Sequence, residues 1–157
     1  MEWKIPPKIE VLQALGAVAK DKVRFISSTE SEVESFNGKE VFSVVWKSEK
    51  NSISSTDSSS TYAGHLGYPA IAFLMILGVL PYDIYLGKKL VDTPWKELKD
   101  AYKDHHLIIN EATQDWNDFD KQRLEKFADW ILKMIEGLNL VKLEEEPKTI
   151  SDFVGKE

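Results

Sequence analysis

Residues 67–81 read Gly67-Tyr-Pro-Ala-Ile-Ala-Phe-Leu-Met-Ile-Leu-Gly-Val-Leu-Pro81, and this stretch decides the fold. Pro69 suits the first turn of a helix, where its missing N–H would have no helical partner. Gly78 suits the left-handed position after the last turn, and Pro81 prevents the helix from continuing. No polar side chain occurs between Pro69 and Gly78. A helix that is apolar on every face must be enclosed by the rest of the protein.

The distribution of serine divides the 157-residue chain into two halves. Twelve of the thirteen serines lie between Ser27 and Ser60, whereas the region after Gly64 is aliphatic, aromatic and charged. This shift predicts strands followed by helices within a single α+β domain over residues 1–143. The acidic residues 144–157 are expected to form a mobile tail.

A helix and an antiparallel meander of three to four strands are predicted before the apolar helix. Residues 7–20 place Ile9, Leu12 and Leu15 on one helical stripe. Strands are predicted over residues 23–28, 32–36 and 40–47, with a weaker fourth over 52–56. Asn37-Gly38 predicts a type I′ hairpin turn. The strand over 40–47 is apolar on both faces, so we expect it in the middle of the sheet, covered on both sides.

Two further helices are predicted to pack the apolar helix. Thr93-Pro94 predicts the start of a helix over residues 94–104, and Asp118 or Asp120 is expected to cap a final helix that ends near Leu138. Residues 82–91 are either irregular or helical, and residues 107–110 either extend a helix or form a short strand. The final helix carries apolar side chains at alternating intervals of three and four: Leu124, Phe127, Ile131, Met134 and Leu138.

The composition excludes several classes of function. The chain has no cysteine, which rules out disulfides, thiolate catalysis and cysteine-based zinc sites. A net charge of −6 and only two arginines, Arg24 and Arg123, argue against a general nucleic-acid binder. No apolar run reaches the roughly 20 residues that a membrane-spanning helix needs, and no signal-peptide pattern is visible. We therefore expect a cytoplasmic protein; similar compositions also occur in thermophiles.

No pattern of metal ligands or catalytic residues emerges from the sequence. On a helix, the adjacent His105 and His106 would point about 100° apart, so they could not share one metal ion there. Outside a helix, Asp104, His105 and Asp115 could converge, although such residues more often cap helices or face water. The serine tract 52–61 lacks the G-x-S-x-G elbow of a hydrolase. We predict no catalytic residue, no metal and no cofactor.

The segment Tyr62-Ala-Gly-His-Leu-Gly-Tyr68 immediately precedes the apolar helix. Backbone N–H groups at a helix start attract anions, so Tyr62, His65 and Tyr68 could line a site for a small acidic ligand. The alternative is a tight turn with its aromatic residues packed over the helix end.

Residues 41–77 resemble the ββα arrangement of SWIM-type zinc modules, in which a strand carries Cys-x-Cys and a later Cys-x-His opens a helix. Here Ser52 and Ser54 stand at the first cysteine positions, and His65 alone keeps a ligand type. The resemblance therefore implies no zinc binding.

Tryptophan is the remaining prominent residue type. Trp46, Trp95 and Trp130 fall on predicted inward stripes and are expected in the core. Aromatic side chains also anchor protein interfaces. The candidate interface residues are Trp3, Trp116, Trp130 and Met134.

The sequence favours a non-catalytic intracellular interaction or accessory domain that self-associates or binds a protein partner. An alternative is a small-molecule-binding protein or enzyme that uses Tyr62, His65 and Tyr68, together with Asp57 or Asp83. A second alternative is weak nucleic-acid binding through a local face of lysines: Lys88, Lys89, Lys96, Lys99 and Lys103.

Overall fold

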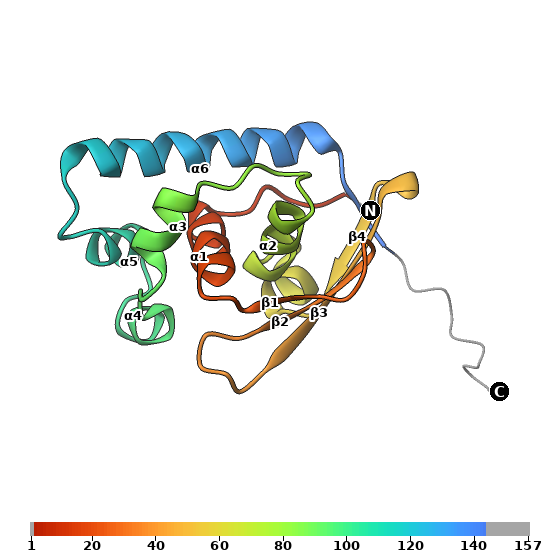
Figure 1. Ribbon diagram of the computed structural model, residues 1–157, viewed down its shortest axis with the longest axis horizontal. Coiled ribbons are helices and arrows are strands. Elements are labelled where there is room, and N and C mark those ends of the chain that lie inside the picture. Colours follow the sequence, from red (N-terminus) through yellow and green to blue (C-terminus); the bar gives the residue numbers. More distant parts are fainter. Residues whose placement is uncertain (1, 144–157) are drawn as a thin grey trace.

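Helices cover one face of a five-stranded sheet in the computed structural model of the chain, which describes residues 2–143 (Figure 1). This confirms the predicted α+β class. The predicted tail, 144–157, lies outside the described residues. The helices are α1 (Lys8–Ala19), α2 (Tyr68–Ile76), α3 (Ile84–Leu90), α4 (Trp95–Ala101), α5 (His105–Ala112) and α6 (Asp118–Leu138). The strands are β1 (Val23–Phe25), β2 (Glu30–Glu34), β3 (Val41–Lys47), β4 (Ser52–Ser55) and β5 (Val141–Lys142).

The sheet has the order β1-β2-β3-β4-β5, which confirms the predicted meander and the central position of β3. Strands β1 to β4 pair antiparallel, and β2 places Val33 between Val23 of β1 and Phe42 of β3. The short β5 adds a parallel partner to β4 that the sequence did not predict. A two-residue strand leaves no periodic signal in a sequence.

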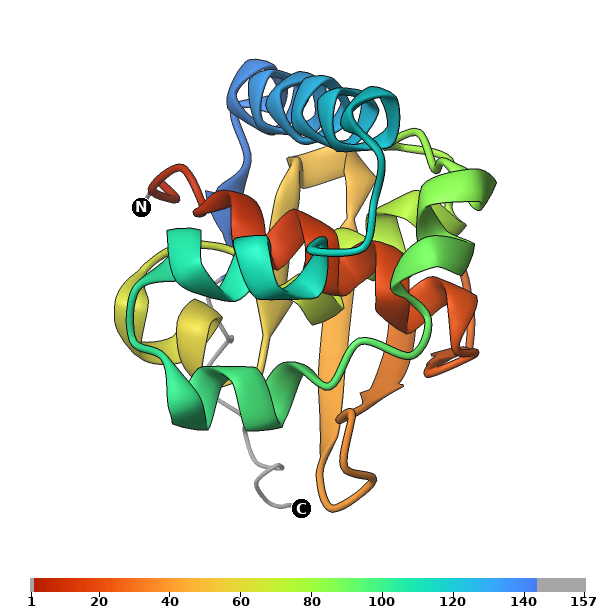
Figure 2. The same cartoon turned by 90° about the vertical axis from the view of Figure 1, so that its left-hand side faces the viewer.

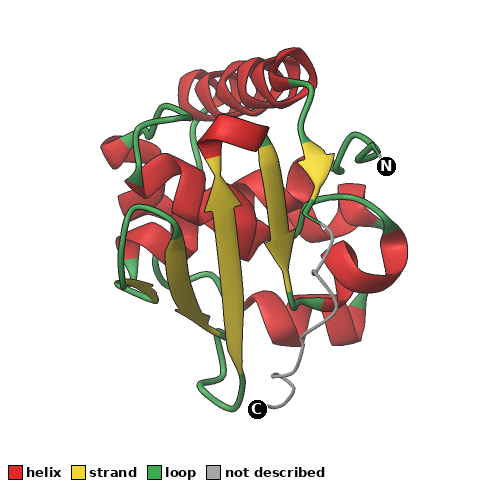
Figure 3. Cartoon of the chain, turned by 90° about the vertical axis from the view of Figure 1, so that its right-hand side faces the viewer, coloured by secondary structure: helices red, strands yellow, loops and turns green. Residues whose placement is uncertain are grey.

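The outer face of the sheet carries no helix (Figure 3). Val41 of β3 is 60% exposed on this face, and Ser43 is exposed too. The prediction that both faces of β3 are covered is therefore wrong. Glu30 and Glu34 of β2 lie opposite Val45 and Val41, so this face mixes valines with carboxylates.

The hairpin between β2 and β3 is also wider than predicted. Glu34 pairs with Val41, so six residues, 35–40, make the connection. Gly38 has φ +74°, but Asn37 does not have the positive φ of a type I′ turn. Instead, Asn37 Oδ1 accepts hydrogen bonds from Ser35 Oγ at 2.8 Å and from the Lys39 N–H at 2.9 Å. This side-chain bonding organises the wider loop.

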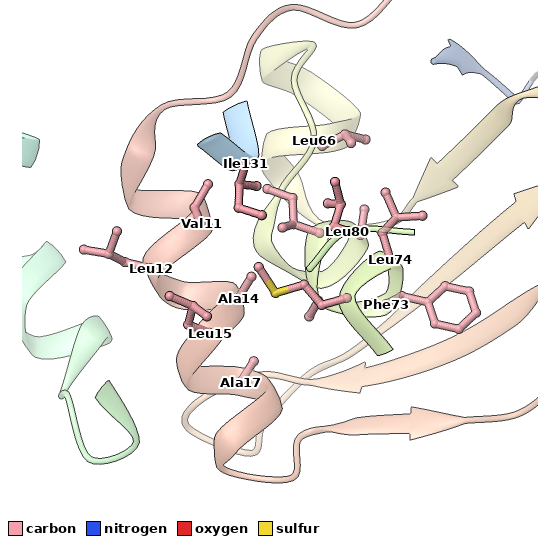
Figure 4. Packing of buried hydrophobic residues seen from close by; sticks show 14 of the residues in the cluster. Val11, Leu12, Ala14, Leu15, Ala17, Leu66, Phe73, Leu74, Leu80 and Ile131 are labelled. Atoms are coloured by element: carbon pink, nitrogen blue, oxygen red, sulfur yellow. The ribbon is translucent and has the colours of Figure 1, made fainter. Parts of the chain in front are cut away.

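Helix α2 is the buried centre of the domain, as the sequence predicts. All seven residues of 69–75 are buried, and Gly78 takes φ +77° just beyond the helix end. Its main helical neighbour is α1, and strands β1, β3 and β4 contact it as well (Figure 4). The two later helices were predicted to provide most of this packing. Helix α1 takes that place because nine consecutive residues, 9–17, are buried, far more than one amphipathic stripe.

Between α2 and residue 143 the structure contains four helices; two were predicted, with residues 82–91 left as either irregular or helical. The predicted helix over 94–104 ends at Ala101, because Asp104 starts a new helix by accepting the His106 N–H at 2.8 Å. Residues 107–110 therefore belong to α5. Asn117, not Asp118 or Asp120, caps α6, since its Oδ1 accepts the Asp120 N–H at 2.7 Å. Helix α6 lies across α1 (Figures 1 and 2).

Candidate functional site

The N-terminus of α2 receives a carboxylate from within the chain. The Tyr68 N–H donates to Glu10 Oε1 at 2.9 Å, and Ser59 Oγ donates to Glu10 Oε2 at 2.9 Å. A negative charge at this end of a helix is stabilising. Glu10 thus occupies a position that the sequence suggested for an acidic ligand. Tyr68 and Glu10 are 58 residues apart, so no local pattern reveals the pairing.

A second buried carboxylate, Asp57, ties β4 to the start of α2. Its Oδ1 accepts from Ser55 Oγ and from Ser60 Oγ, and its Oδ2 accepts the Ser60 N–H at 3.1 Å. Ser60 Oγ in turn accepts the Gly67 N–H at 3.0 Å. These serines are therefore engaged in a structural network.

The structure places the three ligand-binding residues suggested by the sequence in different environments. Tyr62 is 86% exposed, in the helical turn η2 (Ser59–Ala63). His65 is half-buried, and its Nδ1 lies 3.1 Å from the carbonyl oxygen of Leu66. Tyr68 is half-buried and lines a cavity. Whether Tyr62 and His65 bind a ligand stays a prediction.

The cavity beside Tyr68 has a volume of about 350 Å³ and lies between α1, the β2–β3 hairpin and α4. Figure 2 shows α4 and this hairpin at the same end of the molecule. The Tyr68 ring lies 5.0 Å from the Phe36 ring and 6.3 Å from the Phe42 ring, centroid to centroid. We call this space the Gln13 cavity. Its polar lining includes Gln13, Ser35, Asn37, Glu40, Ser58, Lys96, Lys99 and Asp100.

Two buried polar atoms in the lining residues of this cavity have no hydrogen-bond partner among the described residues. Gln13 is 2% exposed and its Oε1 is unpaired; Trp95 is 1% exposed and its Nε1 is unpaired. A Cβ added to Gly16, one turn from Gln13 on α1, would lie 3.3 Å from Trp95 Nε1. Most buried polar atoms in proteins are paired, and leaving one unpaired costs about 1–3 kcal/mol. The same Cβ would lie 3.2 Å from the Leu90 carbonyl oxygen, so the Trp95 indole N–H lies on the side of α1 that faces the end of α3.

The Tyr68 hydroxyl stays protonated at neutral pH. Burial raises the pKa of Tyr68 well above its ordinary value, and the nearby carboxylates Asp57, Glu10 and Glu40 raise it further. A neutral phenol can both donate and accept a hydrogen bond. Tyr68 thus contributes an uncharged polar group beside an aromatic wall.

A second cavity, of about 390 Å³, lies between α1, α5 and α6 and is lined in part by His105 and His106. Its buried Thr113 donates from Oγ1 to the carbonyl oxygen of Ile109 at 2.9 Å. Lys8 forms ion pairs with Glu125 and Asp129 beside it. Thr113 and Lys8 thus already have partners within the chain. Within residues 2–143, no three His, Cys, Asp or Glu side chains are grouped to hold a metal.

The candidate interface residues lie in different environments. Trp3, Trp116 and Met134 are half-buried against the core. Lys142 lies over the Trp3 ring at 5.0 Å and Lys89 over the Trp116 ring at 4.8 Å. Their role in an interface stays a prediction.

Trp130 is 52% exposed on α6, so its predicted place in the core is wrong. Its ring meets the Phe127 ring edge-on at 6.0 Å. The expected burial of Trp46 and Trp95 is confirmed.

The lysines of the suggested nucleic-acid face are divided between two places. Lys89 lies 3.3 Å from Asp120 Oδ2, between α3 and α6. Lys96 and Lys99 line the Gln13 cavity instead, where Lys96 also lies 3.4 Å from Asp100 Oδ2.

Asp120 is expected to make stability depend on pH. Its pKa is lowered chiefly by the Tyr85 hydroxyl, which donates to Oδ2 at 2.8 Å, and also by Lys89. A carboxyl with a lowered folded-state pKa adds stability above its unfolded pKa of about 3.9, and this is lost as pH falls through the folded value. Replacing Tyr85 by phenylalanine should therefore move the Asp120 carboxyl titration, followed by ¹³C NMR, to higher pH. Tyr62→Phe serves as the control, and an unshifted Asp120 titration in Tyr85→Phe would contradict the assignment.

Comparison with known proteins gives one match. The family model described as Uncharacterised conserved protein UCP014422 matches residues 3–141. No curated protein and no solved structure matches the chain. None of the helices in residues 2–143 is both long and apolar enough to cross a membrane.

Proposed function

The chain belongs to the family of Uncharacterised conserved protein UCP014422, and we propose that it binds a small, flat, polar molecule in the Gln13 cavity. The observation that carries the proposal is the unpaired Oε1 of a Gln13 side chain that is almost fully buried. An amide placed there without a partner destabilises the free protein. This oxygen has less than 1 Å² of accessible surface, so a ligand reaches it only after the amide turns toward the cavity, and the hydrogen bond then removes that cost.

The shape and lining of the cavity support the same proposal. Ligand cavities in proteins have volumes of about 300–1,000 Å³, mostly apolar walls and a few convergent polar groups. The Gln13 cavity has a volume in this range, and four aromatic residues, Phe36, Phe42, Tyr68 and Trp95, share its wall with eight polar or charged residues.

The proposal is for binding alone. The two buried carboxylates nearest the cavity, Glu10 and Asp57, accept hydrogen bonds on each of their oxygens. Neither of these two has an oxygen without a donor that could take a proton from a ligand, as a general base must. Glu40 and Asp100 also line the cavity, and we propose no proton transfer for them.

The test is an NMR titration of the ¹⁵N-labelled protein with nicotinamide and benzamide, two flat amides. We expect the indole N–H signal of Trp95 and the side-chain amide signal of Gln13 to move, because both groups lie at the cavity. The indole signal of Trp130, on α6, should stay in place. Benzene, which offers no hydrogen bond, serves as the matched apolar probe. Unmoved Trp95 and Gln13 signals with both amides would contradict the proposal.

Self-association is a second candidate function, supported by the outer side of α6. Phe119 is 72% exposed and lies eleven residues before Trp130. Eleven residues make about three helical turns, so both rings lie on the same side of α6. In an antiparallel pair of α6 helices, Phe119 of each copy would face Trp130 of the other, as two-fold symmetry requires.

Trp130→Glu is expected to weaken such a dimer at least about thirtyfold, because a central interface tryptophan contributes 2 kcal/mol or more. Sedimentation equilibrium of both proteins measures the dissociation constant. Tyr62→Glu, at another exposed aromatic residue, is the matched control and should leave the constant unchanged. A wild-type protein that is monomeric at every concentration would exclude this candidate.

The proposal includes a cytoplasmic location. Its support is the cysteine-free composition, in which 29% of residues are charged. Fractionation of the source cells, with detection of the native protein, tests this location.

A further inference from the structure

We propose that the cavity between α1, α5 and α6 binds a fatty acid of medium chain length, with the alkyl chain inside the cavity and the carboxylate at its rim. This site is separate from the Gln13 cavity, so the inference does not depend on the function proposed above. Three features support it: the helix faces that line the cavity, its apolar floor and its cationic rim.

The lining residues of this space, which we call the α5 cavity, follow the spacing of helix faces. On α5 they include His105 and Ile109, four residues apart, and on α6 they include Lys121, Leu124 and Ala128. Residues three or four apart lie on the same side of a helix, so each helix turns one side toward the cavity. Helix α6 packs on α1, whereas α5 packs chiefly against α4. Figure 2 shows α5 in front of α1 and beneath α6.

The floor of the α5 cavity is apolar. It consists of buried side chains, each at most 3% exposed: Ile9, Leu12, Leu124 and Ala128. The buried Thr113 also lines the cavity, but it already donates its hydroxyl proton to the carbonyl oxygen of Ile109. An apolar cavity of about 150 Å³ can bind benzene, and the α5 cavity has a volume of about 390 Å³. It therefore has room for a larger apolar group.

The lining favours an alkyl chain over an aromatic ring. Apart from the two histidines at its rim, no aromatic side chain lines the α5 cavity in the part of the chain that the structure describes. Aromatic groups gain binding energy beyond their buried area when they pack on other rings. The aliphatic floor offers an aromatic ligand no such partner, whereas an alkyl chain needs only apolar contact.

The rim carries more cationic than anionic groups, although the whole chain has a net charge of −6. His105, His106 and Lys121 line the cavity and are exposed. Within residues 2–143, Glu125 is the one carboxylate residue of the lining, and Lys8 already forms an ion pair with it. Lysine carries a positive charge, and a histidine ring supplies an N–H donor. A single carboxylate at the rim therefore meets donors and positive charge while its chain lies on the apolar floor.

The first test compares octanoate, hexanoate, octanol and octyltrimethylammonium by isothermal titration calorimetry at low ionic strength. We expect octanoate to bind at least tenfold more tightly than hexanoate, because each buried methylene strengthens binding about fourfold. Octanol, which has the chain without the charge, should bind at least fivefold more weakly than octanoate. Octyltrimethylammonium, which has the opposite charge, should bind more weakly still.

The second test locates the ligand within the protein. His105→Gln/His106→Gln/Lys121→Gln should lower the affinity for octanoate to that for octanol and leave octanol binding unchanged. Lys133→Gln, at an exposed lysine of α6 outside the lining, is the matched control and should change nothing. Ala128→Leu should abolish binding of both ligands, because the larger side chain fills the floor. In methyl ¹³C spectra of the wild type, octanoate should move the signal of Ala128 and leave that of Ala72, in α2, in place.

Three results would overturn the inference. Equal affinities for octanoate and octanol would show that the rim does not recognise a carboxylate. Tighter binding of 4-phenylbutyrate than of octanoate would show that the cavity takes an aromatic acid and not an alkyl chain. An unmoved Ala128 signal in the presence of saturating octanoate would show that the acid binds elsewhere or not at all, whether or not Ala128→Leu folds.

Discussion

Replacing Phe73 by alanine is expected to lower the free energy of unfolding by about 3–5 kcal/mol, the usual range for a buried phenylalanine. Phe73 is fully buried at the middle of α2, and its ring centroid lies 6.5 Å from that of Phe25 in β1. The change removes the apolar contact between the central helix and the sheet and leaves a cavity. Because whole domains have about 5–15 kcal/mol of stability, a loss of this size is large.

Urea denaturation followed by circular dichroism measures this change. Ile76→Ala, at the end of the same helix, is the matched control. It should cost about 1 kcal/mol or less, since its side chain is already 43% exposed. Equal costs for the two variants would show that α2 is not enclosed as described.

The second large effect is expected for Asp57→Ala, with a loss of roughly 3 kcal/mol of stability. This carboxylate accepts hydrogen bonds from Ser55, from the Ser60 hydroxyl and from the Ser60 N–H. Its removal leaves these buried donors without their partner. The chain just before α2 then loses its connection to β4. Chemical denaturation again measures the cost, and a loss below about 0.5 kcal/mol, the range of an ordinary surface change, would contradict this role.

A double-mutant cycle with Gly67→Ala tests the same contact from its other side. A Cβ at Gly67 would lie 1.8 Å from Asp57 Oδ2 and 2.6 Å from its Cγ. Gly67→Ala is therefore expected to destabilise the wild type strongly and the Asp57→Ala protein far less. The coupling should lie within the 0.5–3 kcal/mol that is typical of contacting residues. Additive costs would contradict the close approach.

The sequence predicts the fold where the signal is local. The apolar run with its prolines and Gly78 gives α2, and alternating strands give the meander. The sequence does not predict that α4 ends at Ala101, because the helical pattern of residues 94–104 continues past that point. The new helix begins only because the Asp104 side chain caps it. Trp130 lies on the apolar stripe of α6. This stripe is wider than the part of α6 that packs against the rest of the protein, so Trp130 remains exposed.

The candidate site depends on contacts between distant segments, which a single sequence does not reveal. Glu10 and Tyr68 meet only in the folded chain, although the sequence identified the start of α2 as a place for an anion. Gln13 reads as one polar residue on a predicted helix. Only the folded structure shows that its side chain is buried and that its Oε1 has no hydrogen-bond donor.

The measurement that tests the central claim most directly is the unfolding free energy of Gln13→Met without ligand. Methionine has nearly the same length but no group that needs a hydrogen bond. If the Gln13 amide serves ligand binding and not stability, Gln13→Met should be more stable than the wild type by about 1 kcal/mol and should no longer bind the ligand. If the amide instead supports the fold, the variant will be less stable by a similar amount, and the account of the cavity as a binding site is contradicted.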